Sequence, residues 1–102
     1  MLKKDTYTIR EVQRMQLDRA RQIASRGIRS GGEFKFMRKI SDLRAKEIAK
    51  LLGVTPETIS RWENGKQPIP KTAAFAVGEL VDQPSITRKR LTAISAVHVK
   101  SR

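Results

Sequence analysis

The residues from Ala45 to Asn64 place small and apolar side chains where two helices must cross at close range. This spacing predicts a helix-turn-helix, a motif whose second helix enters the major groove of DNA. The chemistry that the segment could perform is therefore hydrogen bonding to base edges and phosphates. Ser, His and Asp are present, but no nucleophile elbow or other local catalytic signature accompanies them, and we predict no enzyme.

The second helix of this segment has clear start and stop signals. Thr55 can cap it with its hydroxyl, Pro56 suits the first helical position, and Glu57 faces the positive end of the helix dipole. Asn64-Gly65 closes it. The first helix is expected from about Arg44 to Leu52, with Gly53 ending it. Either Asp42 or Ser41 is expected to cap that first helix.

Charge is unevenly distributed along the 102 residues, whose formal net charge is +12. Residues 1–40 hold 11 Lys and Arg against 4 Asp and Glu, residues 41–83 hold 6 against 6, and residues 84–102 hold 5 against none. This pattern favours basic arms that hold phosphates around a neutral centre that reads bases. The alternative is that solvated arms only keep the protein soluble.

Breaks in the pattern divide the chain into three parts: a basic N-terminal helix or arm (1–29), a central domain (30–83) and a basic tail (84–102). A helix is expected from Thr8 to about Ser25, and another from Thr72 to Val81. The chain breaks at residues 27–32, where Ser30 with Glu33 can form a capping box for a helix that carries Phe34, Met37 and Ile40. The tail from residue 85 fits either a helix or a strand. His98 is expected to be a solvated tail residue.

Aromatic side chains are expected mainly in the core. Trp62 follows Ile59 by three residues on the inward face of the second motif helix, which favours packing over base stacking. Phe34, Phe36 and Phe75 are predicted to be core residues as well. With no Cys and one His, the chain should need no metal, and we predict no cofactor. The start of the sequence lacks the apolar core of a signal peptide, so a cytoplasmic location is expected.

A family resemblance follows from these residues. The segment from Phe36 to Pro70, with Leu-Leu-Gly-Val-Thr-Pro-Glu-Thr-Ile-Ser-Arg-Trp-Glu-Asn-Gly-Lys at its centre, resembles the XRE family of phage-repressor and Cro-like helix-turn-helix domains. The resemblance implies an all-α, lambda-repressor-like bundle of about five helices. Residues 67–72 further resemble the DNA-binding domain of MqsA-type antitoxins, although those proteins usually carry a cysteine-ligated zinc domain that a chain without Cys cannot form.

The resemblance also implies roles for individual residues. Base contacts are expected from Pro56, Glu57, Thr58 and Arg61, and phosphate contacts from Arg44, Lys46, Thr55, Ser60, Asn64, Lys66 and Lys71. Arg61 is the foremost of these, because its planar guanidinium can span O6 and N7 of guanine. For Glu57 the alternative is a first-turn acid that stabilises the helix dipole and touches no base.

Together these features predict a sequence-specific transcriptional regulator that binds palindromic double-stranded DNA as a homodimer. We expect it to be a repressor, and specifically the autorepressing antitoxin of a toxin-antitoxin pair. The main alternative is a protein-interaction module whose N-terminal helix grips a partner such as a toxin through Ile9 and Val12. A third interpretation is nonspecific binding to nucleic acid through the basic flanks.

Overall fold

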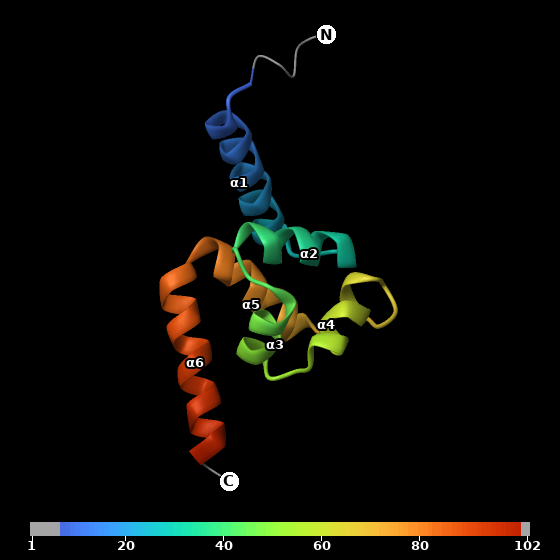
Figure 1. The fold of residues 1–102 in the computed structure, drawn as a ribbon, viewed down its shortest axis with the longest axis vertical. Helices are drawn as coiled ribbons and strands as arrows, with labels where there is room; N and C mark the ends of the chain where they lie inside the picture. The colour runs from blue at the N-terminus through green and yellow to red at the C-terminus, as the bar shows by residue number, and fades with distance from the viewer. Residues whose placement is uncertain (1–6, 101–102) are drawn as a thin grey trace.

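The computed structural model describes the backbone of residues 7–100 and the side chains of residues 7–94. Within this range the chain forms six helices and no strand (Figure 1). They are α1 (Ile9–Arg26), α2 (Gly31–Ile40), α3 (Ala45–Leu52), α4 (Pro56–Glu63), α5 (Lys71–Asp82) and α6 (Pro84–Lys100). The predicted all-α class is confirmed, and the helix beyond the expected five is the tail, which is helical.

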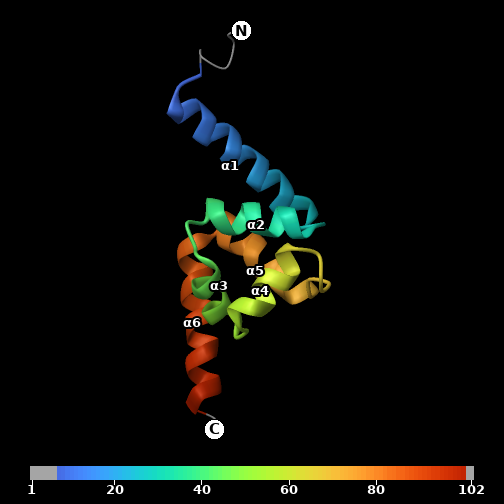
Figure 2. The same ribbon diagram turned by 45° about the vertical axis from the view of Figure 1, so that its right-hand side comes forward.

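Helix α1 begins with a complete capping box. The Thr8 hydroxyl accepts from the Glu11 backbone N–H, and the Glu11 carboxylate accepts from the Thr8 N–H. Only its C-terminal half is anchored, through buried Ala20 and Ile23, while Ile9 is 79% exposed. The N-terminal half of α1 therefore projects from the body, and α6 runs to the opposite end (Figures 1 and 2).

The connection between α1 and α2 turns at Gly27, which has the positive φ of 97° that glycine tolerates. Ser30 caps α2 as predicted by accepting from the Glu33 N–H at 3.1 Å. The Glu33 carboxylate bonds instead to the Arg29 N–H and to the Arg26 guanidinium, so the capping box at Ser30 is only half formed. The ion pair ties the end of α1 to the start of α2.

The core gathers side chains from all six helices around Phe34 and Trp62, whose rings meet edge to face with centroids 5.7 Å apart. Phe36 is half-buried against this core, and the Arg19 guanidinium lies over its ring. The prediction that Phe75 is a core residue is wrong, since it is 70% exposed. Helix α5 buries Ala73, Val77 and Leu80, and Phe75 lies on the other side of this helix.

The expected cap of α3 is also wrong. The N-cap residue is Arg44, and the carboxylate of Glu47 satisfies its backbone N–H at 2.7 Å. Ser41 instead ends α2, with its hydroxyl donating to the Met37 carbonyl at 3.0 Å, and Asp42 adopts a positive φ of 58° in the connection. Neither residue caps α3, because both belong to the turn that leaves α2.

Helix α6 begins at Pro84, directly after α5, because proline suits a first helical turn. Its Thr87 is buried and donates its hydroxyl to the Glu79 carbonyl of α5 at 3.2 Å. Leu91 packs against the core, and α6 also contacts α3. The side chain of His98 lies outside the described residues, so its predicted solvated state stays a prediction.

Candidate nucleic-acid interface

Helices α3 and α4 form the predicted helix-turn-helix. Gly53 ends α3 in the left-handed conformation (φ 72°, ψ 32°), and the Val54 N–H donates to the Ala49 carbonyl at 2.9 Å. Ile48 and Ala49 of α3 are buried, as is Ile59 of α4. The small Ala49 side chain lets the two helices pack closely, which fixes the direction in which α4 points.

The start of α4 is capped as predicted. The Thr55 hydroxyl accepts from the Thr58 N–H at 3.2 Å, and Pro56 occupies the first turn. The Thr55 and Thr58 hydroxyls also lie 3.0 Å apart, so these two side chains hydrogen-bond to each other. Thr58 is half-buried and its hydroxyl is already engaged, whereas Pro56 and Glu57 are exposed.

Helix α4 separates its buried and exposed residues cleanly. Ile59 and Trp62 are buried, Trp62 as predicted, whereas Pro56, Glu57 and Arg61 are exposed. Among the ion pairs of residues 7–94, none involves Arg61. Within the described part of the chain its guanidinium also forms no side-chain hydrogen bond, and Arg61 lies on the helix that a helix-turn-helix inserts into DNA.

The predicted phosphate-contacting residues are all exposed and come from three regions. Arg44 and Lys46 lie at the start of α3; Thr55, Asn64 and Lys66 lie at the ends of α4 or just beyond, and Ser60 lies within it; Lys71 begins α5. The Asn64 side-chain amide donates to the Ser60 hydroxyl at 3.2 Å, so these two are placed side by side. Lys71 also borders a groove on α5.

The carboxylate of Glu47 partly neutralises the positive charge at the start of α3. Its pKa is lowered chiefly by the hydrogen bond from the Arg44 N–H, and further by the charges of Arg44 and Arg88, which outweigh its partial desolvation. The Arg44 Nε lies 3.6 Å from the Glu47 carboxylate. Arg88 of α6 thus acts electrostatically on the same end of α3, which follows from the packing of α6 against α3.

A buried ion pair that the sequence did not reveal holds α4 in place. Arg38 of α2 donates to both carboxylate oxygens of Glu63, from Nε at 2.6 Å and from Nη2 at 3.0 Å, and its Nη1 donates to the Leu43 carbonyl at 3.0 Å. Their side chains are only 10% and 8% exposed. The two residues are 25 positions apart, and no local pattern signals such a pair.

Glycine 31 allows α2 to approach the end of α4. A Cβ at Gly31 would lie 2.4 Å from the Trp62 carbonyl oxygen and 2.5 Å from that of Glu63, closer than real Cβ atoms come. The first turn of α2 and the last turn of α4 therefore meet backbone to backbone. This contact and the Arg38–Glu63 pair fix α4 from its C-terminal end and leave its exposed start free.

Comparison with known proteins agrees with this geometry. Residues 34–80 match the family model described as Helix-turn-helix, whereas no curated protein and no solved structure matches the chain. The chain therefore contains a helix-turn-helix domain, as the XRE-type resemblance predicted, and the match supports a DNA-binding transcription regulator. It does not extend to MqsA-type antitoxins in particular. Across the described residues, none of the helices combines the length and apolar character needed to cross a membrane.

Proposed function

We propose that this protein reads double-stranded DNA in a sequence-specific manner through the exposed face of α4 and regulates transcription as a homodimer. The observation that carries the proposal is the position of Arg61, which is exposed and unpaired among the described residues on the second helix of a helix-turn-helix. Pro56, Glu57 and Thr58 would complete the base contacts. The half-buried, hydrogen-bonded state of Thr58 favours its methyl group as the contacting part, against a thymine methyl.

Phosphate contacts would position α4 in the groove. The candidates are exposed residues around α4: Arg44 and Lys46 at the start of α3, Thr55 at the α4 cap, Ser60 within α4, Asn64 and Lys66 after it, and Lys71 at the start of α5. Two such domains related by a two-fold axis would place their α4 helices in successive major grooves and bind half-sites about one helical turn apart. Occupation of a promoter by such a dimer represses transcription by exclusion, and we propose repression on this ground.

Selection from a randomised double-stranded DNA pool at about 150 mM salt tests this proposal. We expect enrichment of a palindrome with half-sites about ten base pairs apart. The Arg61→Ala variant should lose or relax specificity at one position per half-site, by about 1–3 kcal/mol. Salt-sensitive binding without any enriched sequence would contradict the proposal and support nonspecific binding through the basic flanks.

A second candidate function, the binding of a protein partner, is favoured by the projecting half of α1. On this half Ile9, Val12 and Met15 are 79%, 40% and 52% exposed. Ile9 and Val12 lie on the same side of α1 as Ala20 and Ile23, which are buried further along the helix, so this apolar side extends beyond the core and is free to bind a partner. A toxin is one such partner, and an autorepressing antitoxin would combine both functions. Ile9→Ser with Val12→Ser should abolish partner binding and spare DNA binding, whereas Arg61→Ala should do the reverse.

A further inference from the structure

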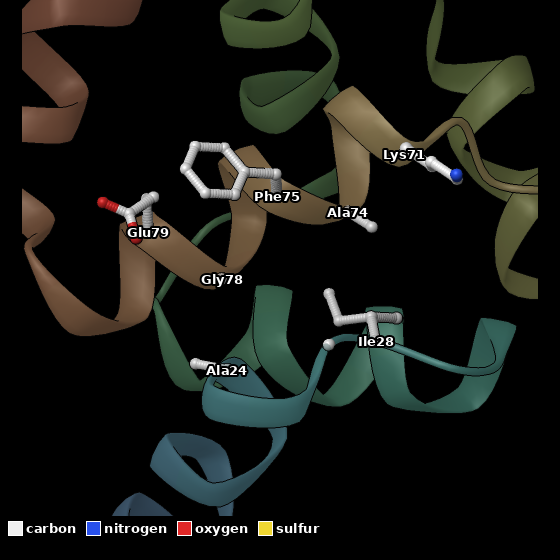
Figure 3. Close-up of a pocket in the computed structure, with 8 residues that line it drawn as sticks. Ala24, Ile28, Lys71, Ala74, Phe75, Gly78 and Glu79 are labelled. Carbon is white, nitrogen blue, oxygen red and sulfur yellow. The ribbon is translucent and has the colours of Figure 1, made fainter.

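Helix α5 carries an exposed aromatic ring beside an apolar groove. Phe75 is 70% exposed, and the adjoining groove of about 280 Å³ is lined largely by small and aliphatic residues of α1, α5 and the α1–α2 connection. Figure 3 shows Phe75 on α5 between Lys71 and Glu79, with Ala24 and Ile28 across the groove. A projecting ring and a hollow on one patch form a surface that can be complementary to itself.

The charges on this face are arranged symmetrically about the ring. Lys71 precedes Phe75 by four residues and Glu79 follows it by four, so all three lie on one side of α5. The two charged residues are about 12 Å apart along the helix axis. If a second α5 lay antiparallel to the first with a two-fold axis at Phe75, Lys71 of each copy would face Glu79 of the other. A parallel arrangement would oppose like charges.

We propose that this face of α5 binds the same face of a second copy across a two-fold axis at Phe75. Each Phe75 ring would enter the groove of the other copy, and two Lys71–Glu79 pairs would flank the rings. Ala74 and Gly78 line the groove with little side chain, Gly78 facing Ala24 of α1, which leaves room there for the ring of the other copy. The inference rests on the proposed function in that it names the surface of the proposed homodimer.

This arrangement gives Lys71 a role other than the phosphate contact implied by the family resemblance. Its ammonium group borders the groove at one end, and Glu79, which lies at the other end, is half-buried. A phosphate contact would not require an acidic residue eight positions further along α5. The two roles separate by charge reversal, because a reversed ion pair is restored by reversing its partner and a phosphate contact is not.

Sedimentation velocity over a range of protein concentrations, without DNA, tests the surface directly. Lys71→Glu or Glu79→Lys creates two like-charged pairs per dimer, and each should raise the dimer dissociation constant about tenfold. The double variant Lys71→Glu/Glu79→Lys should return close to the wild-type value. A wild-type protein that stays monomeric would overturn the proposal. So would a double variant whose dimer dissociation constant is no lower than those of the two single variants.

Cross-linking gives a second readout that does not depend on the ion pairs. The chain contains no cysteine, so Phe75→Cys introduces one thiol at the proposed two-fold axis, and mild oxidation should link two chains. Ile86→Cys, at a position 44% exposed on α6, is the matched control and should stay monomeric under the same conditions. Equal cross-linking of both variants would contradict the surface. If Phe75→Cys, which lacks the ring, does not cross-link, the sedimentation experiment on chains that keep Phe75 decides.

DNA binding by the same variants separates the surface from the proposed function. We expect Lys71→Glu to weaken binding to a two-half-site DNA, and the double variant to restore it. A dimer that cross-links at residue 75 but selects no DNA sequence would support the surface and defeat the DNA-reading proposal. Specific DNA binding by a protein whose dimerisation is insensitive to both charge reversals would defeat the surface and leave the DNA-reading proposal standing.

Discussion

Arg38 and Glu63 form a bidentate ion pair that joins α2 to the last residue of α4, with Nε–Oε2 and Nη2–Oε1 distances of 2.6 and 3.0 Å. Both side chains are almost completely buried, and the third guanidinium bond goes to the Leu43 carbonyl. Every described hydrogen-bonding group of the buried side chains has a partner. The pair therefore sets the position of α4 relative to α2 without leaving an unsatisfied charge.

Removing one member of this pair should destabilise the protein strongly. Arg38→Met leaves the Glu63 carboxylate buried and uncompensated, so we expect the free energy of unfolding to fall by about 3 kcal/mol in urea denaturation. The double variant Arg38→Met/Glu63→Leu removes both charges and should recover most of that loss. A double variant no more stable than the single would show that the uncompensated charge is not the cause.

Gly31 and its neighbour Gly32 offer a matched pair of substitutions. Gly31→Ala places a methyl group against the Trp62 and Glu63 carbonyls, and separating the backbones should cost about 1–3 kcal/mol. Gly32→Ala meets only the Ser30 hydroxyl, at 3.8 Å, and should be neutral or stabilise by up to about 1 kcal/mol. Thermal unfolding of both variants checks this, and equal melting temperatures would contradict the close approach.

Local chemistry explains which features the sequence could predict. Thr55, Pro56 and Gly53 act through their own backbone or the next turn, so the end of α3 and the start of α4 followed from residue types alone. The burial of Trp62 followed from its spacing to Ile59, within a single helix. These signals need no knowledge of how the helices are arranged.

Features that depend on neighbouring helices could not be predicted in this way. Phe75 was expected in the core because helical spacing identifies apolar residues but does not say which of them another helix covers. The Arg38–Glu63 pair and the approach at Gly31 join segments more than twenty residues apart. The cap of α3 was wrong for a related reason, since a carboxylate within the helix reaches back to Arg44.

The Arg26–Glu33 pair predicts a dependence of stability on pH. The hydrogen bond from Arg26 and that from the Arg29 N–H lower the pKa of Glu33 from an ordinary value of 4.5 to about 2. Because the folded pKa is the lower one, this contribution is full above pH 4.5 and is lost as the pH falls towards 2. Solvent screens the partly exposed pair, so we expect about 1 kcal/mol. Glu33→Gln should remove this part of the dependence in urea denaturation between pH 2 and 5, and an unchanged profile would contradict it.

Trp62 and Arg61 are adjacent in sequence, but alanine substitutions at the two positions should have different effects on stability. Trp62→Ala removes a ring that packs against Phe34 and should cost about 3–5 kcal/mol of unfolding free energy. Arg61→Ala changes an exposed residue and should leave stability within about 0.5 kcal/mol of wild type. Circular dichroism with urea denaturation separates them, and an Arg61→Ala variant as unstable as Trp62→Ala would show that Arg61 is a structural residue.

The basic run on α6 should contribute to the salt dependence of DNA binding without contributing to sequence preference. Arg88, Lys89 and Arg90 are exposed, whereas Thr87 and Leu91 anchor the helix, so neutralising the three charges is a cleaner change than deleting the tail. Each phosphate contact that is lost lowers the slope of log K against log salt by about 1. The triple glutamine variant should therefore bind all sequences more weakly with a shallower slope, while the enriched site stays the same. A changed site with an unchanged slope would instead place these residues at base edges.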